Sequence, residues 1–160
     1  ALKSGLFVEE TDHLLPFWKI LENVLSSQHK TKPVHSLNDM IKLKKKFSNN
    51  IKCFVAKKND QVLAGILIFE TIDVAHTQYL ANSKFGRTMG ALDLIVFELV
   101  YKVYKSKKYF NFGISTENKF LTSSTISRWS NVFVSQSNSS RIAYFLSQEI
   151  NRSEAIIRIL

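Results

Sequence analysis

Cysteine, proline and glycine are all scarce in this chain of 160 residues, which has one Cys, two Pro and five Gly. The single cysteine, Cys53, excludes an internal disulfide and a cysteine-rich zinc site, so we expect a reducing compartment, the cytoplasm. The longest mainly apolar run, 91–100, contains Asp93 and Glu98 and is far shorter than the roughly 20 residues that cross a bilayer. The sequence therefore predicts no transmembrane helix.

What the chain does contain favours a folded domain. Hydrophobic residues make up 45% and charged residues 22%, a balance that excludes intrinsic disorder. We expect a single domain over 1–160, with a helical part over 1–50, a core over 51–118 and a C-terminal part of different composition over 119–160. The formal charge of +9 favours an anionic partner, which could be a phosphate, a nucleic acid, an acidic cofactor or a membrane surface.

Two helices are predicted before residue 50. Apolar residues at helical spacing predict the first over 12–29, with Pro16 in its first turn. Ser36 or Asn38 is expected to cap a second helix that ends near residue 47. The lysines of this helix are expected on its outer, solvated surface, although they could also bind phosphates: Lys42, Lys44, Lys45 and Lys46.

The pattern then changes to that of strands. Segments 51–56 and 61–70 alternate around the turn residues Asn59-Asp60 and predict a hairpin, and 74–81 predicts a third strand of an antiparallel meander. Gly65 is expected to mark a bulge.

A long buried helix and a fourth strand complete the predicted core. Apolar residues over 92–103 repeat at helical spacing, and 108–114 reads as a strand, so these elements form a βαβ unit with the third strand. Beyond the core, 132–134 and 142–146 could be strands, and 153–160 reads as a short helix or a frayed end.

The first of three polar clusters is His76-Thr77-Gln78-Tyr79 on the third strand. His76 and Gln78 are two positions apart, so we expect them on one face, where the imidazole accepts a proton and the amide forms hydrogen bonds. The alternative is a structural role in cross-strand hydrogen bonding or in the core.

The second cluster is 84–91, predicted as a loop that enters the long helix. Its glycines and cations, together with the unpaired N–H groups of a helix start, are typical of a phosphate site. The alternative is an ordinary strand-to-helix turn.

The third cluster is 113–118, where the fourth strand ends in polar residues. Ligands of sheets with parallel strands bind beyond the carboxyl ends of those strands, so we expect the three clusters to meet at the mouth between the third and fourth strands. The alternative for this cluster is a helix cap or a turn.

Other chemistries have little support. The remaining histidines, His13, His29 and His35, lack the spacing of metal ligands, so no metal is expected. Cys53 on an alternating strand is expected to be a small core residue rather than a nucleophile.

Segments 76–79, 90–93 and 109–118 resemble, in this order, bacterial acyltransferases of the GNAT superfamily, nearest to its FemAB-like branch. Segments 33–37 and 62–65 look similar as well. The resemblance covers 3–118 and implies the α/β (α+β) fold of acyl-CoA N-acyltransferases, in which an antiparallel meander precedes a βαβ unit with splayed parallel strands.

The resemblance also implies a donor site. Acyl-CoA, such as acetyl-CoA, places its pyrophosphate on the loop before the central helix and its pantetheine between the splayed strands. In the family pattern the last loop position is Gly or Ala, whereas this chain has Leu92. The residues implied for the donor are Gln78, Tyr79, Arg87, Thr88, Met89, Gly90 and Ala91.

The implied reaction is transfer of the acyl group to an amine by direct attack. His76 or Glu117 is the candidate base, and main-chain N–H groups near Gln78 or Tyr79 are expected to stabilise the carbonyl oxygen. The residues expected to orient the acceptor are Ser115, Thr116 and Asn118.

Partners and alternatives follow from the FemAB-like relatives, which carry two such domains in tandem and transfer amino acids from charged tRNA onto a cell-wall precursor. The donor could thus be aminoacyl-tRNA, the acceptor a small-molecule amine or a peptidoglycan precursor, and the partner a second domain of this kind or a second copy. In other function classes, the chain is a non-catalytic binding half of such a protein, or a basic RNA-binding domain.

Overall fold

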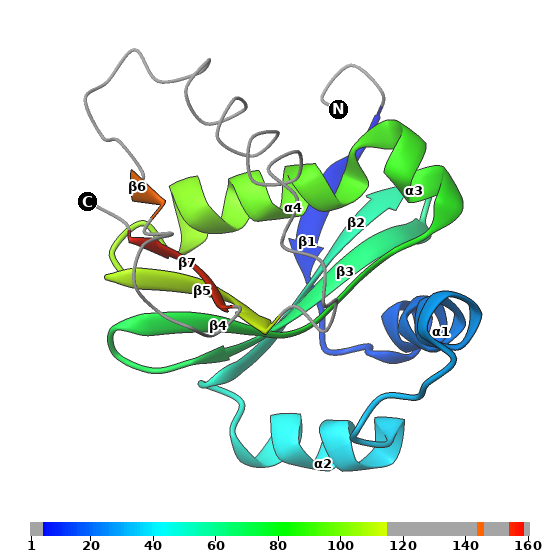
Figure 1. Ribbon diagram of the computed structural model, residues 1–160, viewed down its shortest axis with the longest axis horizontal. Coiled ribbons are helices and arrows are strands. Elements are labelled where there is room, and N and C mark those ends of the chain that lie inside the picture. Colours follow the sequence, from blue (N-terminus) through cyan, green and yellow to red (C-terminus); the bar gives the residue numbers. More distant parts are fainter. Residues whose placement is uncertain (1–4, 115–143, 146–153, 159–160) are drawn as a thin grey trace.

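A seven-stranded sheet with helices on both faces organises the part of the chain that the computed structural model describes, residues 5–114, 144–145 and 154–158. Its strand order is β1-β2-β3-β4-β5-β7-β6. Helix α4 covers one face, while α1 and α2 lie on the other (Figure 1). The α/β prediction is confirmed.

The strands are β1 (Phe7–Glu10), β2 (Ile51–Lys58), β3 (Gln61–Glu70), β4 (Val74–Asn82), β5 (Tyr109–Ile114), β6 (Tyr144–Phe145) and β7 (Glu154–Arg158). The helices are α1 (Leu15–Val24), α2 (Leu37–Lys46), α3 (Lys84–Met89) and α4 (Ala91–Glu98), with π-helical turns η2 (Leu25–His29) and η3 (Leu99–Val103).

The two N-terminal helices form where the sequence predicts them. Helix α1 starts later than residue 12, with Leu14 at the N-cap and Pro16 in its first turn, and it continues into η2. Helix α2 is capped by Ser36, not Asn38, because Ser36 and Asp39 form a reciprocal capping box. The hydrogen bonds from Ser36 also lower the pKa of the Asp39 carboxyl.

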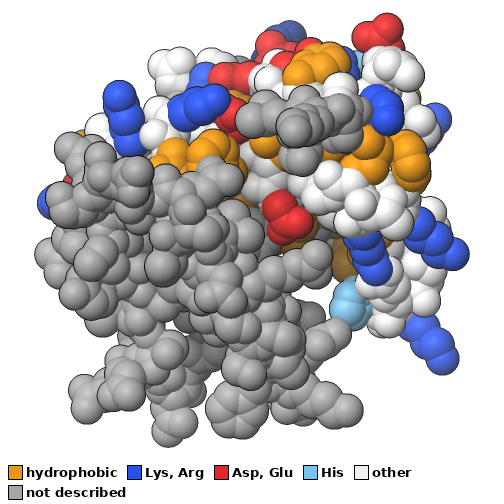
Figure 2. Space-filling model, turned by 90° about the horizontal axis from the view of Figure 1, so that it is seen from above, with side chains coloured by type: hydrophobic (Ala, Val, Ile, Leu, Met, Phe, Trp, Pro, Cys, Tyr) orange, Lys and Arg blue, Asp and Glu red, His pale blue; other side chains and the backbone are white. Residues whose placement is uncertain are grey.

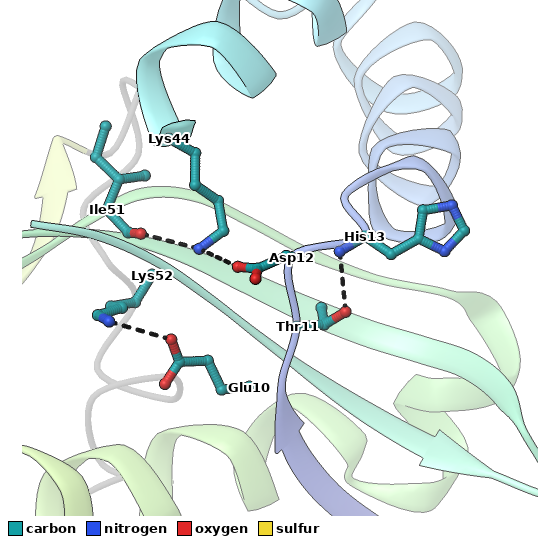
Figure 3. Close-up of polar contacts among 7 residues, drawn as sticks. All are labelled: Glu10, Thr11, Asp12, His13, Lys44, Ile51 and Lys52. Carbon is teal, nitrogen blue, oxygen red and sulfur yellow. Dashed lines mark hydrogen bonds and ion pairs between the residues drawn. The ribbon is translucent and has the colours of Figure 1, made fainter. Parts of the chain in front are cut away.

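Lys44 departs from the prediction that the lysines of α2 lie in solvent. Its side chain is only 8% exposed, and its Nζ donates to the main-chain oxygen of Ile51 at 3.1 Å and pairs with Asp12 at 2.9 Å (Figure 3). Lys44 follows Met40, which is buried in the core beneath α2, by one helical turn, so the same face of the helix carries both residues inward. The hydrogen bond from Lys44 and its charge lower the pKa of Asp12.

The meander of β2, β3 and β4 is antiparallel, as predicted. The turn places Asn59 and Asp60 at positive φ, 47° and 63°, which suits a two-residue hairpin loop. Gly65 does not mark a bulge, since it pairs in register with Val55 and with Ala81. A Cβ on Gly65 would lie 2.8 Å from Cγ of Phe17, so the glycine is needed for the close approach of α1 to the sheet.

The predicted βαβ unit is confirmed, since β5 pairs with β4 in parallel after the chain has crossed the sheet through α4 and η3. Residues of α4 and η3 pack on one face of the sheet in a core that includes Ile95, Leu99 and Phe110, each 0% exposed. The helical spacing of the apolar residues over 92–103 therefore marks the face that this helix buries. None of the helices within the described ranges has the length and apolar character to cross a membrane.

Two edges of the sheet differ from the sequence-based expectation. Strand β1, which pairs with β2, was not predicted, because a strand with four residues offers too short a pattern. The prediction of a short helix or a frayed end over 153–160 is wrong: Glu154–Arg158 form β7, whose pairing with β5 prevails over local preference. Of the strand predicted at 142–146, Tyr144–Phe145 are strand β6, and 132–134 lie outside the described residues.

Candidate functional site

The central feature of the candidate site is the separation of β4 from β5. Their pairing begins at Val74 with Tyr109 and ends at His76 with Asn111. Beyond this point β4 continues to Asn82 while β5 continues to Ile114, which pairs with β7. The edge of β4 after His76 is therefore not paired with β5 in the part of the chain that the structure describes.

A bulge in β4 lies beside the point of separation. On β3, Ile68 pairs with Thr77 and Leu67 pairs with Tyr79, so Gln78 is an extra residue with no partner on β3. A bulge bends the strand and interrupts its alternation. The simple alternation from which we expect His76 and Gln78 on one face is therefore interrupted between these two residues.

His76 instead shares a face with Tyr79. Residues that pair across neighbouring strands lie on the same face, and the partners of His76 and Tyr79 are Phe69 and Leu67. Both partners pack in the core beneath α1 and α2. His76 and Tyr79 thus lie on the α1 face of β4, on either side of the bulge.

Thr77 lies on the opposite face, toward α4. It is 4% exposed, it pairs with Ile68 of the α4 core, and its Oγ1 has no hydrogen-bond partner among the described residues. A buried hydroxyl without a partner is costly, by about 1–3 kcal/mol. This position, next to the point of separation, is one that sequence reasoning did not single out.

The segment predicted as a phosphate-binding loop is largely helical. Lys84–Met89 form α3, capped by the Ser83 side chain, and Gly90 in the left-handed conformation (φ 66°) joins α3 to α4. The loop prediction is wrong because a serine cap begins a helix within the segment. Gly86 is buried, and a Cβ there would lie 2.6 Å from the main-chain oxygen of Leu63, so this glycine allows α3 to pack on β3 rather than a ligand to approach.

The start of α4 keeps the properties of an anion site, with one opposing group. Gly90 caps the helix without a side-chain hydrogen bond, and Lys84 and Arg87 are exposed on the preceding turn. Asp93, however, lies in the first turn of α4, where its negative charge interacts with the same positive helix end. The Thr88 hydroxyl donates to the main-chain oxygen of Phe85, and Met89 packs partly against the core.

The structure locates two of the three predicted clusters. His76, Gln78 and Tyr79 lie on β4, whereas Arg87 lies in α3 and Gly90 joins α3 to α4. Of the third cluster, Gly113 and Ile114 end β5, while Ser115, Thr116, Glu117 and Asn118 lie outside the described residues.

Sequence reasoning also missed a contact between Tyr79 and His35. The Tyr79 Oη lies 2.8 Å from Nδ1 of His35 and accepts a hydrogen bond from its main-chain N–H at 3.2 Å. His35 belongs to the segment between η2 and α2, 44 positions before Tyr79. No sequence pattern links residues so far apart, and only the packing of α1 and α2 on the sheet brings them together.

Other reactive groups take no part in this arrangement. Cys53 is 0% exposed, and burial raises the pKa of its thiol to about 12, which keeps it protonated and unreactive. A shallow cavity of about 200 Å³ lies by the turn between β2 and β3, near His13, Lys57 and Asp60. The described ranges contain no cluster of three or more His, Cys, Asp or Glu side chains that could hold a metal ion.

Positive charge does not gather into one patch on the face drawn in Figure 2. Lys and Arg side chains of the described residues lie there at several separate places, with acidic and hydrophobic side chains between them. Some lysines are already paired: Lys57 with Glu9, Lys52 with Glu10 at 3.4 Å and Lys107 with Glu70 at 3.2 Å. The Lys and Arg side chains that the structure describes on this face therefore do not form a single positive patch.

Known proteins are similar to this chain in structure. No protein-family model matches it, and no curated protein matches it. An acetyltransferase of the GNAT family from Staphylococcus aureus Mu50 matches with a TM-score of 0.59 and 9% identity, over 97% of this chain and 99% of the other. An acetyltransferase from Bacillus subtilis in complex with CoA matches with a TM-score of 0.53 and 10% identity, over 97% and 99%. An aminoglycoside acetyltransferase from an uncultured soil metagenomic sample, in complex with trehalose, matches with a TM-score of 0.55 and 13% identity, over 94% and 99%.

Identities this low show a common fold rather than a common activity. The chain thus has the fold of GNAT acetyltransferases, which confirms the fold implied by the sequence resemblance.

Proposed function

We propose that this protein transfers an acyl group from acyl-CoA to an amine, by direct attack of the amine on the thioester. The observation that carries the proposal is the separation of β4 from β5 after His76 and Asn111, beside the bulge at Gln78. An unpaired strand edge offers a row of N–H and C=O groups to an extended ligand. The pantetheine arm of CoA, which contains amide groups, is such a ligand.

The start of α4 supports the same donor. We propose that the pyrophosphate of CoA lies against Gly90 and Ala91, with Arg87 and Thr88 beside it and Met89 beneath. The exposed cations Lys84 and Arg87 offset the charge of Asp93. The likeness in fold to the Bacillus subtilis acetyltransferase that binds CoA supports this assignment.

For the chemistry, His76 is the proposed base on the described part of the chain. It is partly exposed and lies on the α1 face, beside the end of the β4–β5 pairing. We propose that N–H groups of Gln78 or Tyr79 stabilise the carbonyl oxygen as negative charge develops on it. Glu117 remains the alternative base, with Ser115, Thr116 and Asn118 proposed to orient the acceptor.

The donor and acceptor have alternatives. Aminoacyl-tRNA and a peptidoglycan precursor are the pair that the FemAB-like resemblance suggests, with a second such domain or a second copy as partner. On the face drawn in Figure 2, the described Lys and Arg side chains form no single positive patch that could follow a nucleic-acid backbone, and we propose a small donor rather than tRNA. Small-molecule amines are the favoured acceptors, because one protein of similar fold is an aminoglycoside acetyltransferase.

The test begins with binding. Calorimetric titration of the protein with acetyl-CoA, longer acyl-CoAs and charged tRNA is expected to give saturable binding of an acyl-CoA. Replacing the cation at the α4 start by Arg87→Glu is expected to weaken binding about tenfold, and Lys19→Glu, an exposed cation on α1, serves as the matched control. Absence of binding to every donor contradicts the proposal and favours a non-catalytic module.

Turnover is then measured as release of the CoA thiol with polyamines, lysine peptides and aminoglycosides as acceptors. We expect His76→Ala or Glu117→Gln to lower kcat/KM by more than about tenfold, while His13→Ala, an exposed histidine outside the site, leaves it unchanged. If neither variant loses this much, the assignment of the base is wrong.

A further inference from the structure

The contact between His35 and Tyr79 joins the segment before α2 to the strand that carries the proposed site. Two polar groups of His35, its main-chain N–H and its ring Nδ1, meet the same Tyr79 oxygen at 3.2 and 2.8 Å. The two rings also meet edge to face, with centroids 6.0 Å apart. These contacts fix the position of the Tyr79 hydroxyl, and the tautomer of His35 decides which of the two groups donates in the Nδ1 contact.

The ring of Tyr79 is fixed from its other side by α1. It packs edge to face against Trp18, with centroids 5.4 Å apart, and Trp18 is 1% exposed. Tyr79 itself is partly exposed. The hydroxyl is therefore held between a rigid core contact and a contact to the neighbouring segment, at the surface of the α1 face.

Tyr79 lies on β4 beside the bulge, in the part of the strand that carries the proposed base His76. It follows the bulge residue Gln78 directly, and it shares the α1 face with His76 on the other side of the bulge. Groups on both sides of the bulge thus border the place where β4 and β5 separate, on the face opposite α4.

The hydrogen bonds also suggest where the hydroxyl proton lies. Because the Tyr79 oxygen accepts from the main-chain N–H of His35, its own proton can be donated to Nδ1 when the imidazole is neutral and protonated on Nε2. In this arrangement Tyr79 can receive a proton on its oxygen while it passes its own proton to His35.

We propose that Tyr79 takes the first proton from the ammonium form of the acceptor, with His35 as its positioning residue and proton acceptor. The N–H bond of the ammonium breaks, a new O–H bond forms at Tyr79, the original hydroxyl proton moves to Nδ1 of His35, and the imidazolium then returns one proton to solvent. The free amine attacks the thioester, and its second proton leaves by way of His76 and ends on the CoA thiol. This inference rests on the proposed function and names the protonated primary amine as the acceptor class.

Titratable groups of α2 and β4 lie around His35. Asp39 of α2 is close enough for the charge of His35 to contribute to lowering its pKa, although the hydrogen bond from Ser36 is the largest cause. Tyr79 and His76 are the titratable groups of β4 on this face, and α1 contributes the uncharged Trp18.

The first test is spectroscopic and needs no acceptor. Nitrogen NMR of the imidazole groups is expected to show neutral His35 with its proton on Nε2 and with a hydrogen-bonded Nδ1, and Tyr79→Phe is expected to shift the Nδ1 signal alone. A proton on Nδ1 in neutral His35 overturns the inference. His29, an exposed histidine of η2, is the reference signal.

The second test uses turnover with acetyl-CoA and Nα-acetyl-lysine amide or spermidine. Tyr79→Phe, which keeps the ring on Trp18, is expected to lower kcat/KM about 30-fold at pH 7, with KM for acetyl-CoA unchanged. The defect is expected to shrink to less than about threefold near pH 10, where about a quarter of an amine with the ordinary pKa of about 10.4 is already neutral, compared with well under about 1% at pH 7. His35→Gln is expected to be intermediate, because an amide can hold the hydroxyl but cannot take its proton.

The outcomes separate the two proposals. If the wild-type protein binds acyl-CoA but releases no CoA thiol with either amine, this inference is overturned. If the wild-type protein also fails to bind acyl-CoA, the proposed function is overturned as well. Wild-type turnover that Tyr79→Phe leaves unchanged, or a defect that is equal at pH 7 and pH 10, overturns this inference alone. Thermal unfolding of both variants checks that they are folded. If Tyr79→Phe does not fold, the turnover of His35→Gln still tests the inference.

Discussion

The two faces of the sheet are stabilised in different ways. On the α4 face, an aliphatic stripe of α4 and η3 packs on the sheet, and polar side chains contribute little. On the α1 face, the short helices α1 and α2 also bury apolar residues, but specific polar contacts hold them, Lys44 to Asp12 and Ile51, and His35 to Tyr79. Apolar packing tolerates substitutions that conserve volume, whereas a hydrogen bond needs a specific partner. The α1 face is thus the one on which a few residues carry both structure and proposed chemistry.

The largest effect is expected from a cavity on the α4 face. Ile95 is 0% exposed in the middle of the helix, so Ile95→Ala should lower the free energy of unfolding by about 3 kcal/mol. Val103→Ala, on the same helical stripe but 47% exposed, is the control and should change it by less than about 0.5 kcal/mol. Denaturant unfolding measures both, and equal losses would show that the stripe is not what holds this face.

A smaller loss is expected from crowding on the α1 face. Gly65→Ala places a Cβ within 2.8 Å of Cγ of Phe17 and should lower the free energy of unfolding by about 2 kcal/mol. A double-mutant cycle with Phe17→Leu should show favourable coupling, since the smaller side chain makes room for the methyl group. Strictly additive losses would contradict this explanation of the glycine.

The polar anchor of α2 is expected to contribute less again. Lys44→Met keeps the length of the side chain but leaves the main-chain oxygen of Ile51 without its donor, which should lower the free energy of unfolding by about 1 kcal/mol. Lys45→Met, at an exposed position of the same helix, is the matched control. If both variants unfold alike, the buried lysine does not stabilise this face.

The smallest effect concerns pH. The pKa of Asp12 is lowered in the folded protein by the hydrogen bond and charge of Lys44, so ionised Asp12 stabilises the fold above its ordinary value of 3.8, and this contribution is lost as the pH falls below that value. Wild type should therefore be slightly more stable than Asp12→Asn near neutral pH, and the difference should vanish in acid. Unfolding curves at several pH values measure this, and a difference that grows in acid has the wrong sign.

The comparison also shows why some predictions from the sequence succeeded. Helix and strand periods identified the elements between Leu15 and Ile114 other than α3, because each period marks one buried face, and the turn at Asn59 and Asp60 carried its own chemistry. The predictions failed where the decisive partner is distant in the chain. Glu154–Arg158 became a strand through pairing with β5, and Lys44 became buried through Asp12 and Ile51.

Predictions about the candidate site also failed where a distant residue is the decisive partner. The sequence identified His76 and Gln78 as a polar cluster on a strand, but the register with β3 made Gln78 a bulge residue and put His76 on the same face as Tyr79. It proposed a loop at 84–91, and the Ser83 cap made most of it a helix. His35 was considered only as a metal ligand, because nothing near it in the sequence points to Tyr79.

The order of residues alone determined the α/β class, the meander and the crossover helix, because those depend on repeating contacts between near neighbours. Tertiary structure decided where β4 and β5 separate, where the bulge lies and which histidine meets Tyr79. These depend on single contacts between segments far apart in the chain, whose energies become favourable only after the sheet has brought the segments together.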